Sequence, residues 1–421
     1  MSGPGWACRL AAENPTAPHP QTLNKGVLKM RVLIAPSGFK EGLSAPQAAD
    51  CIEHGVLTAM PDAQITKIPM VDGGEGFTRG LVAITGGTLH HARVTGPVVD
   101  MVDAHFGFLG GSDRKTAVIE MAAAAGLRLV PKDRRDPRHT TSFGVGELIS
   151  HALDAGAERI IVGCGDSGIN DGGAGMAQAL GVRLIDDCGQ HLGPGGSELA
   201  RLHHIDLSDR DPRLDGVRID AAVNWKNVLL GRRGVARVFG PQKGATPAQV
   251  EELERSLETY AALIRRDVGP DIGREPGCGA SGGLGAGLKA LIGARLHPRY
   301  DIVMQYFDIE RQLRKVDLVL TAEGRLDDQT PYGKVPVEVA TRAKRHGVPV
   351  IVLAGSIGKG AYTNLNHGID AYASIIKAPC SLDEAMVSGC KLLTHAAEHA
   401  VRMVGIGAGL SDQATALAAT G

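Results

Sequence analysis

Short apolar runs alternate with amphipathic segments at both ends of the chain, which predicts alternating strands and helices. Residues 31–35 and 64–70 are predicted strands. Between them, Ser44-Ala-Pro-Gln47 is a capping-box sequence with proline in the first turn, so we expect a helix from there to about residue 58. Towards the other end, the same pattern predicts strands at 317–320, 348–354 and 371–376, helices near 337–345 and 361–368, and a closing helix at 382–404.

The middle of the chain has a different pattern, in which apolar strands follow one another before helices return. Three successive strands are predicted, then mixed strands and helices, and finally a glycine-rich stretch that enters a helix. The strands are 91–99, 101–109, 116–121, 159–163 and 217–223; the helices are 144–155, 176–180, 247–267 and 288–292, with 277–287 as the glycine-rich stretch.

These elements predict an α/β protein of two domains. The two N-terminal strands are too few for a stable sheet, so the C-terminal strands should complete it. We therefore expect a discontinuous Rossmann/flavodoxin-like domain with a parallel sheet built from both chain ends, residues 30–71 and 291–421, and an inserted α+β domain, residues 72–290. Residues 1–29 contain several prolines and show little hydrophobic periodicity. They also lack the long apolar core of a signal peptide, so we expect a disordered leader.

Composition narrows the class of protein. Hydrophobic residues make up 43% and charged residues 22%, the net charge is −1 and aromatic residues are only 4%, so nucleic acid is not an expected partner. No apolar run is long enough to span a membrane. Seven scattered cysteines without a C-x-x-C pair predict reduced thiols in a cytoplasmic protein. Glycine is nearly twice as common as the average of about 7%, with 57 among 421 residues, and it clusters at predicted strand ends.

One glycine loop resembles a dinucleotide-binding motif. Gly163, Gly165 and Gly168 fit G-x-G-x-x-G directly after a predicted strand, and Asp186 and Asp187 lie about 20 residues further on, where a ribose-binding acid is expected. However, the residues after Gly168 include Gly172-Gly173, which oppose a helix at the point where the motif requires one. An NAD(P)-dependent oxidoreductase that uses this loop is therefore kept only as an alternative.

Several polar loops together carry the groups that phosphoryl transfer requires. Acidic loops contain Asp72 and Glu75, Asn170 and Asp171, and Glu323 and Asp327; basic loops contain Lys40 with Ser44 and Gln242 with Lys243, and Lys334 adds a cation. Lysines and backbone N–H groups bind phosphate, while carboxylates bind Mg²⁺ directly or through water. A Walker A motif and the protein-kinase motifs are both missing from the sequence.

At this point the chain closely resembles the type I glycerate kinases over residues from 30 to the last helix. The resemblance is carried by five ordered motifs: residues 35–45, 69–76, 170–175, 239–245, and 323–327 with 329–330 and 333–336. It implies transfer of phosphate from ATP to D-glycerate with Mg²⁺, and two α/β domains. It favours 2-phosphoglycerate over 3-phosphoglycerate as the product. One departure is Asn224, which stands in a segment where the family often has an aspartate.

The resemblance and the loop chemistry together give the candidate roles. They are Lys40, Asp171 and Lys243 for catalysis; Ser167, Asn170, Asp171, Asp72 and Glu75 for the substrate; Ser44, Gln242, Gln329, Thr330 and Lys334 for nucleotide or phosphate; and Glu323 and Asp327 for the metal. A non-catalytic small-anion binding protein is the second alternative. The oligomeric state is open, with a homo-oligomer among the alternatives.

Overall fold

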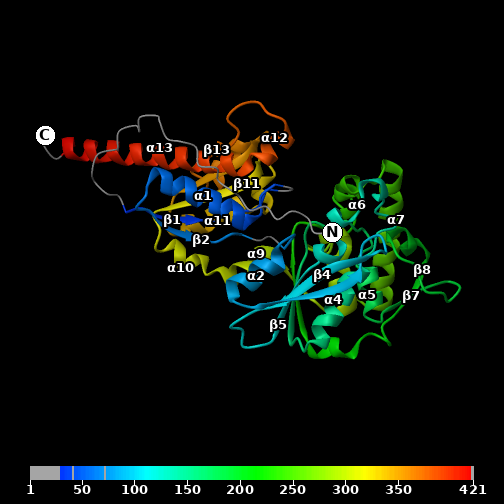
Figure 1. Cartoon of the computed structure of the whole chain (residues 1–421). Coiled ribbons are helices and arrows are strands. Elements are labelled where there is room, and N and C mark those ends of the chain that lie inside the picture. The colour runs from blue at the N-terminus through cyan, green and yellow to red at the C-terminus, as the bar shows by residue number, and fades with distance from the viewer. Residues whose placement is uncertain (1–28, 40–41, 71–72, 419–421) are drawn as a thin grey trace.

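Two β-sheets organise the chain in the computed structural model, which describes residues 29–39, 42–70 and 73–418 (Figure 1). Sheet A has the order β13-β12-β11-β1-β2, and all its neighbouring strands are parallel. Counted along the chain, this is the 2-1-3-4-5 order of flavodoxin-like sheets. The expected parallel sheet from both chain ends is confirmed by β1 (Arg31–Ile34), β2 (Gln64–Lys67), β11 (Leu318–Leu326), β12 (Val350–Ile357) and β13 (Ala371–Ser374).

The two faces of sheet A are covered by different helices because side chains alternate along each strand. Val32 and Ile34 pack with α1 (Ala45–Ala59) and α13 (Gly389–Ala418), whereas Leu33 and Val319 lie in the core that contains α11 (Val335–Arg345). The helix after β1 and the helix after β11 thus cover opposite faces. The order in which the strands are added reverses between β1 and β11, which is the switch point where open α/β sheets bind ligands.

Sheet B is a mixed sheet, as expected for the second α+β part. Its order is β10-β9-β6-β5-β4-β3, with β5, β6, β9 and β10 parallel and the β3–β4 and β4–β5 pairs antiparallel. A separate antiparallel pair, β7–β8, lies outside it. The bounds are β3 (Thr88–Thr95), β4 (Met101–Phe108), β5 (Thr116–Glu120), β6 (Arg159–Gly163), β7 (Arg183–Asp186), β8 (Leu202–Asp206), β9 (Arg218–Val223) and β10 (Arg295–Pro298).

Six helices pack with sheet B in one large apolar core. Val162 and Val223 from the sheet meet Leu148, Leu257 and Leu288 from three of these helices. The helices are α3 (Ala122–Ala125), α4 (Phe143–Asp154), α5 (Ala174–Ala179), α6 (Val235–Phe239), α7 (Pro247–Asp267) and α8 (Ala280–Ile292).

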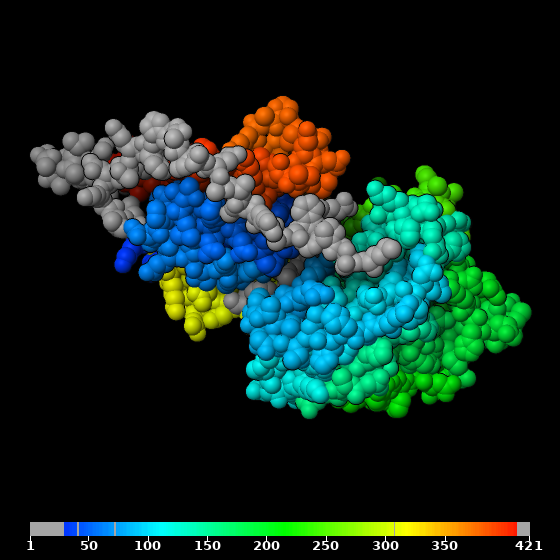
Figure 2. All heavy atoms as spheres, viewed as in Figure 1, coloured from blue at the N-terminus to red at the C-terminus, as the bar shows by residue number. Residues whose placement is uncertain are grey.

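The two sheets are joined by a shared apolar cluster. It contains Val319 of sheet A and Ile161 of sheet B, with Phe77 of α2 (Phe77–Thr85) and Val303 of α9 (Arg299–Phe307) between them. The space-filling view shows the sheet B elements, cyan to green, as a mass beside the blue and orange elements of sheet A (Figure 2). The domain limits stay predictions; β10, which pairs with β9, lies beyond the proposed limit at residue 290.

Three expectations about local structure are corrected. The strand predicted at 317–320 continues to Leu326, because polar residues from Glu323 to Arg325 still pair with β12. The closing helix is two helices, α12 (Leu382–Val387) and α13, separated at Ser388. The helix predicted at 361–368 is a 3₁₀ helix, Ala361–His367. The remaining α-helix, α10 (Ile309–Leu313), follows α9.

The expectation of reduced cysteines is also wrong at one pair. Cys51 of α1 and Cys390 of α13 form a disulfide with Cα atoms 5.5 Å apart, across a separation of 339 residues. Cysteine spacing could not reveal this pair, because the two helices become neighbours only when sheet A is assembled from both chain ends. Cys164, Cys188, Cys278 and Cys380 are free thiols. The predicted leader lies almost entirely outside the described residues.

Candidate functional site

The loop after β2 lies on the strand ends of sheet B. This 73–76 loop (Gly-Gly-Glu-Gly) approaches so closely that a Cβ added at Gly165 would stand 2.6 Å from Gly74 Cα. A Cβ at Gly73 would stand 3.4 Å from both Cys164 N and Ala222 O, at the ends of β6 and β9. Glycine on both sides is therefore what allows a loop from sheet A to reach the carboxyl edge of sheet B.

Glu75 in this loop meets the loop that follows β6. The Glu75 backbone N–H donates to Asp166 Oδ2 at 3.1 Å, and Arg128 Nε lies 3.3 Å from Glu75 Oε1. Ser167 is the next residue after Asp166 and is partly buried. The structure thus places Glu75 against the loop that carries Ser167, another predicted substrate-binding residue. Asp72, which was predicted beside them, lies outside the described residues.

Asp171 is fully buried and accepts four hydrogen bonds. Its Oδ2 accepts from Ser142 N at 2.7 Å, Ser142 Oγ at 2.8 Å and Gly175 N at 3.3 Å, and its Oδ1 accepts from Gly173 N at 3.1 Å. Burial raises the pKa of this carboxyl, and the four donors oppose the rise. Asp171 therefore fixes the start of α5 and the residues before α4, which is a positioning arrangement.

Lys243 reaches the same loop from the segment before α7. It is only 2% exposed, and its Nζ donates to the Ile169 carbonyl oxygen at 2.5 Å. Burial lowers the pKa of Lys243 to about 7, and the negative charge of Asp171 acts in the opposite direction. An anion that binds beside Lys243 would raise the pKa of this lysine, because a neighbouring negative charge favours the protonated form. Gln242, its neighbour, is exposed.

Asn170 completes this buried group. It is fully buried, and neither atom of its side-chain amide has a hydrogen-bond partner among the described residues. A buried amide without partners is costly unless a ligand or water satisfies it, so Asn170 is a candidate contact for a polar ligand. Sequence reasoning did not identify two other members of the group, Ser142 and Tyr260. The Tyr260 hydroxyl donates to the Gly172 carbonyl oxygen at 3.2 Å, but the residue belongs to an ordinary amphipathic helix and no motif marks it.

The second group of predicted residues follows β11 at the switch point of sheet A. Asp327 Oδ1 accepts from Gln329 N at 3.1 Å and from Thr330 Oγ1 and Lys334 Nζ, both at 3.3 Å. Thr330 is buried and Gln329 is exposed. The structure therefore brings Gln329, Thr330 and Lys334 together around Asp327, as the 327–334 loop.

The fit of this loop to a metal depends on the other oxygen of Asp327. Oδ2 lies 2.9 Å from Arg325 Nε, and the Arg325 side chain is 63% exposed. Because the guanidinium is largely exposed although Asp327 is buried, Arg325 can turn into solvent and a cation can then take its place. Glu323 is partly buried within β11, and its Oε1 accepts from Gly324 N at 3.1 Å. Asp327 thus fits a metal through Oδ2 once Arg325 turns away.

The remaining predicted residues belong to the loop after β1. Lys40 lies outside the described residues. Ser44 is the N-cap of α1: its hydroxyl accepts from Gln47 N at 3.4 Å, and its own N–H donates to Gln47 Oε1 at 2.9 Å. The expected capping box is therefore present, and it accounts for Ser44 by itself. A phosphate role for Ser44 stays a prediction.

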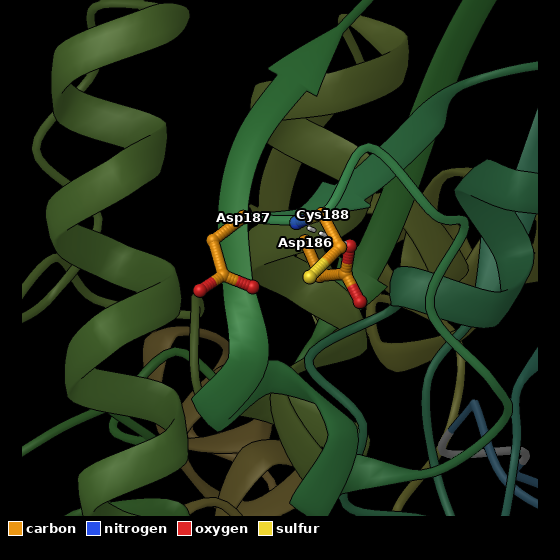
Figure 3. A group of neighbouring side chains, drawn as sticks. All are labelled: Asp186, Asp187 and Cys188. Atoms are coloured by element: carbon orange, nitrogen blue, oxygen red, sulfur yellow. Dashed lines mark hydrogen bonds between the residues drawn. The ribbon is translucent and has the colours of Figure 1, made fainter.

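The acids that suggested a dinucleotide site lie elsewhere. Asp186 ends β7, which pairs with β8 and not with sheet B, so it is not on the strand beside β6. Figure 3 shows Asp186, Asp187 and Cys188 close together at this turn. Asp186 Oδ1 accepts from the N–H groups of Cys188 and Gln190, and Arg201 pairs with its Oδ2 at 2.6 Å. These bonds account for Asp186 as the organiser of a turn.

Among the helices that the structure describes, not one combines the length and the apolar character needed to cross a membrane. The pattern that defines the Glycerate kinase family matches residues 32–405 of the chain.

Similar proteins agree with this match. The chain is 47% identical to the Glycerate kinase of Halalkalibacterium halodurans over 368 residues, which cover 87% of this chain and 96% of that protein. It is 45% identical to the Glycerate 2-kinase of Escherichia coli (strain K12) over 378 residues, 90% of this chain and 99% of that protein. A crystal structure of a Salmonella typhimurium LT2 protein assigned as glycerate kinase 2 superimposes with a TM-score of 0.74 at 46% identity, covering 90% of this chain and 99% of that one. The chain therefore belongs to the glycerate kinase family of enzymes.

Proposed function

We propose that this kinase transfers the γ-phosphoryl group of ATP to D-glycerate, with 2-phosphoglycerate and ADP as products. The observation that carries the proposal is the 45% identity to a protein named Glycerate 2-kinase, over 99% of that protein's length. In the reaction, a glycerate hydroxyl oxygen forms a bond to the γ-phosphorus, the bond from that phosphorus to the β–γ bridging oxygen breaks, and the hydroxyl proton is lost.

The geometry supports an acceptor side on sheet B. Asn170 offers a buried amide, Ser167 and Glu75 lie at neighbouring loops, and Lys243 places a buried amino group 2.5 Å from the Ile169 oxygen. We assign glycerate to these residues, with Asp72 as a further contact, Asp171 as the residue that holds the loop, and Lys243 as the charge that stabilises the transferring phosphate or the substrate carboxylate.

The nucleotide side is assigned to the switch point of sheet A. Gln329, Thr330 and Lys334 lie there together, and Lys40, Ser44 and Gln242 are assigned to the phosphates on the strength of the sequence motifs. Mg²⁺ is the proposed cofactor, with Glu323 and Asp327 as its protein ligands. When bound, it would neutralise phosphate charge. A cytoplasmic location is part of the same proposal.

The test is a measurement of ADP formation with MgATP and D-glycerate. We expect ADP only when both substrates are present, and a phosphorus NMR signal of 2-phosphoglycerate. A 3-phosphoglycerate signal would overturn the assigned position of transfer alone. Saturable NAD or NADP binding without ADP formation would favour the oxidoreductase alternative, and glycerate binding without turnover would favour the anion-binding alternative.

A further inference from the structure

The N-terminal cap of helix α2 comes from a strand of sheet B. The helix begins at Phe77, and its N-cap residue is Gly76, whose φ is 85° and which has no side chain to accept a hydrogen bond. Glu120, the last residue of β5, takes that place: its Oε2 accepts from Thr78 N at 3.0 Å, and its carboxylate also accepts from the Gly76 N–H. A side-chain oxygen on the first N–H groups of a helix is the usual role of an N-cap residue, which here is filled from sheet B.

The charge of Glu120 is supported mainly by this cap. The residue is 2% exposed, and burial raises its pKa, while the N–H groups of Thr78 and Gly76 lower it. His105 Nε2 lies 3.6 Å from Glu120 Oε1, but burial lowers the pKa of His105 to about 4, so the imidazole is neutral near pH 7. Arg128 contributes a further attraction and Glu75 a repulsion. The N-terminus of α2 is thus a principal electrostatic partner of this carboxylate.

A second carboxylate acts on the same segment. Asp166, after β6, accepts from Glu75 N at 3.1 Å and has a φ of 48°, which is uncommon for a residue other than glycine. The ends of β5 and β6 therefore supply acceptors for the N–H groups of Glu75, Gly76 and Thr78. The 73–76 loop, although it continues from sheet A, is held in place by side chains of sheet B.

We propose that Glu120 is a positioning residue for the phosphoryl acceptor. It would fix the 73–76 loop, and with it Glu75, at the carboxyl edge of sheet B where Ser167 and Asn170 lie. This inference rests on the proposed function, because it gives the loop a role in binding glycerate. Replacing a carboxylate that served stability alone would weaken the folded state as a whole. Replacing a positioning carboxylate should weaken binding of the acceptor more than binding of the nucleotide.

The experiment compares Glu120→Gln with a matched control, Glu147→Gln, in the full chain. The glutamine keeps one acceptor oxygen for the backbone donors but removes the negative charge that the N-terminus of α2 favours. Glu147 of α4 makes the same kind of bond, since its Oε2 accepts from Thr95 N at 2.6 Å, but it does so at the outer strand β3. Glu120→Asp, which keeps the charge but is one methylene shorter, is measured in parallel and replaces Glu120→Gln if that variant does not fold.

Two readouts decide the matter. Hydrogen exchange without ligands should be about tenfold faster at the Gly76 and Thr78 amides in the Glu120 variants, and unchanged there in Glu147→Gln. The KM for D-glycerate should rise about tenfold in the Glu120 variants, while the KM for ATP stays within about twofold.

Unchanged exchange at Gly76 and Thr78 in a folded Glu120 variant would overturn the proposal. Equal increases in the KM for D-glycerate and the KM for ATP would also overturn it, as would the same increase in the KM for D-glycerate in Glu147→Gln. If the unaltered chain forms no ADP with D-glycerate, the proposed function fails, yet the exchange measurement still decides whether Glu120 positions the loop.

Discussion

Lys226 Nζ lies 4.2 Å from the centre of the Tyr332 ring, and this contact joins a loop of sheet B to a loop of sheet A. Lys226 follows β9, and Tyr332 belongs to the 327–334 loop after β11. Beside it, the Gly333 carbonyl oxygen accepts hydrogen bonds from Arg299 and, at 3.3 Å, from the Tyr300 hydroxyl. A loop of sheet B and the start of α9 are therefore in physical contact with the 327–334 loop, which is assigned to the nucleotide.

A double-mutant cycle on this pair should show a small coupling. We expect Lys226→Met and Tyr332→Leu to interact by about 0.5–1 kcal/mol in the free energy of unfolding, the range for an exposed cation–π contact. Tyr332 is 52% exposed, so a larger value is not expected. Urea unfolding of the four proteins measures it. A second cycle that starts from Tyr332→Phe keeps an aromatic ring and should give the same coupling between Lys226→Met and the loss of the ring. A coupling of zero in the first cycle would show that the contact contributes nothing to stability.

Replacing Lys243 should affect both turnover and the pH dependence of stability. Because the ammonium is placed beside the assigned acceptor, Lys243→Met should lower kcat by about 100-fold in a folded protein. The pKa of this lysine falls from 10.5 to about 7 on burial, so between pH 7 and about 10 the unfolded chain binds more protons than the folded one. This lysine therefore contributes stability that rises with pH across that window, and the variant should lose that contribution.

Urea unfolding at several pH values from 7 to 10 checks the second part of this prediction. The control is Lys344→Met, which removes a half-exposed lysine paired with Asp370. A Lys243→Met protein with normal turnover, or with the same pH slope as the unaltered chain, would mean that the lysine is either catalytically idle or not neutralised by burial.

Local signals in the sequence located single elements well but not their meeting points. Helix α7 has the bounds that its amphipathic pattern predicts, and the Ser44–Gln47 capping box starts α1 as expected. In contrast, the contact of Lys243 with Ile169 joins positions 74 residues apart. Nothing in either segment encodes that distance; it results from how α7 and α8 pack over the loop.

Polar residues in regular structure explain the other misses. The apolar run of β11 ends before Glu323, so periodicity placed this residue in a loop, whereas hydrogen bonds to β12 continue the strand to Leu326. The sequence gives no signal for Glu120, because a glutamate at the end of a buried strand forms no motif. Its role is visible only once Thr78 of α2, 42 residues earlier in the chain, lies beside it.

The disulfide between α1 and α13 should stabilise the fold measurably. Cross-linking two positions so far apart restricts the unfolded chain, and removal of a native disulfide typically costs about 2–5 kcal/mol. Cys51→Ser should therefore lower the urea midpoint relative to the oxidised protein, and a reductant should have the same effect. Cys188→Ser, at an exposed free thiol, is the control and should have little effect.

A thiol titration of the denatured, unreduced protein provides an independent check. Seven cysteines less the two in the bond leave five, of which four are free thiols in the described part of the chain, so we expect at most five reactive thiols. Seven reactive thiols in freshly purified protein would mean that the pair is reduced under those conditions, as the sequence pattern alone predicts.

Thermal stability and the Mg²⁺ requirement together distinguish a metal-binding role of Asp327, in the 327–334 loop, from a purely structural role. Its Oδ1 is engaged by Gln329, Thr330 and Lys334, while Oδ2 faces the exposed Arg325. Asp327→Asn weakens both ion pairs, so we expect some loss of thermal stability. It also removes the anionic oxygen that Mg²⁺ prefers, and we therefore expect a several-fold increase in the Mg²⁺ concentration for half-maximal turnover.

The matched control for Asp327→Asn is Asp370→Asn. Asp370 has the same kind of partners, a lysine ammonium from Lys344 and a backbone N–H from Val350 at 2.8 Å, but it lies just before β13. Its replacement should lower stability and leave the Mg²⁺ requirement unchanged. If Asp327→Asn behaves in the same way as this control, then Asp327 only organises its turn, and the carboxylates that hold Mg²⁺ must be sought elsewhere, first at Glu323 and in the 73–76 loop.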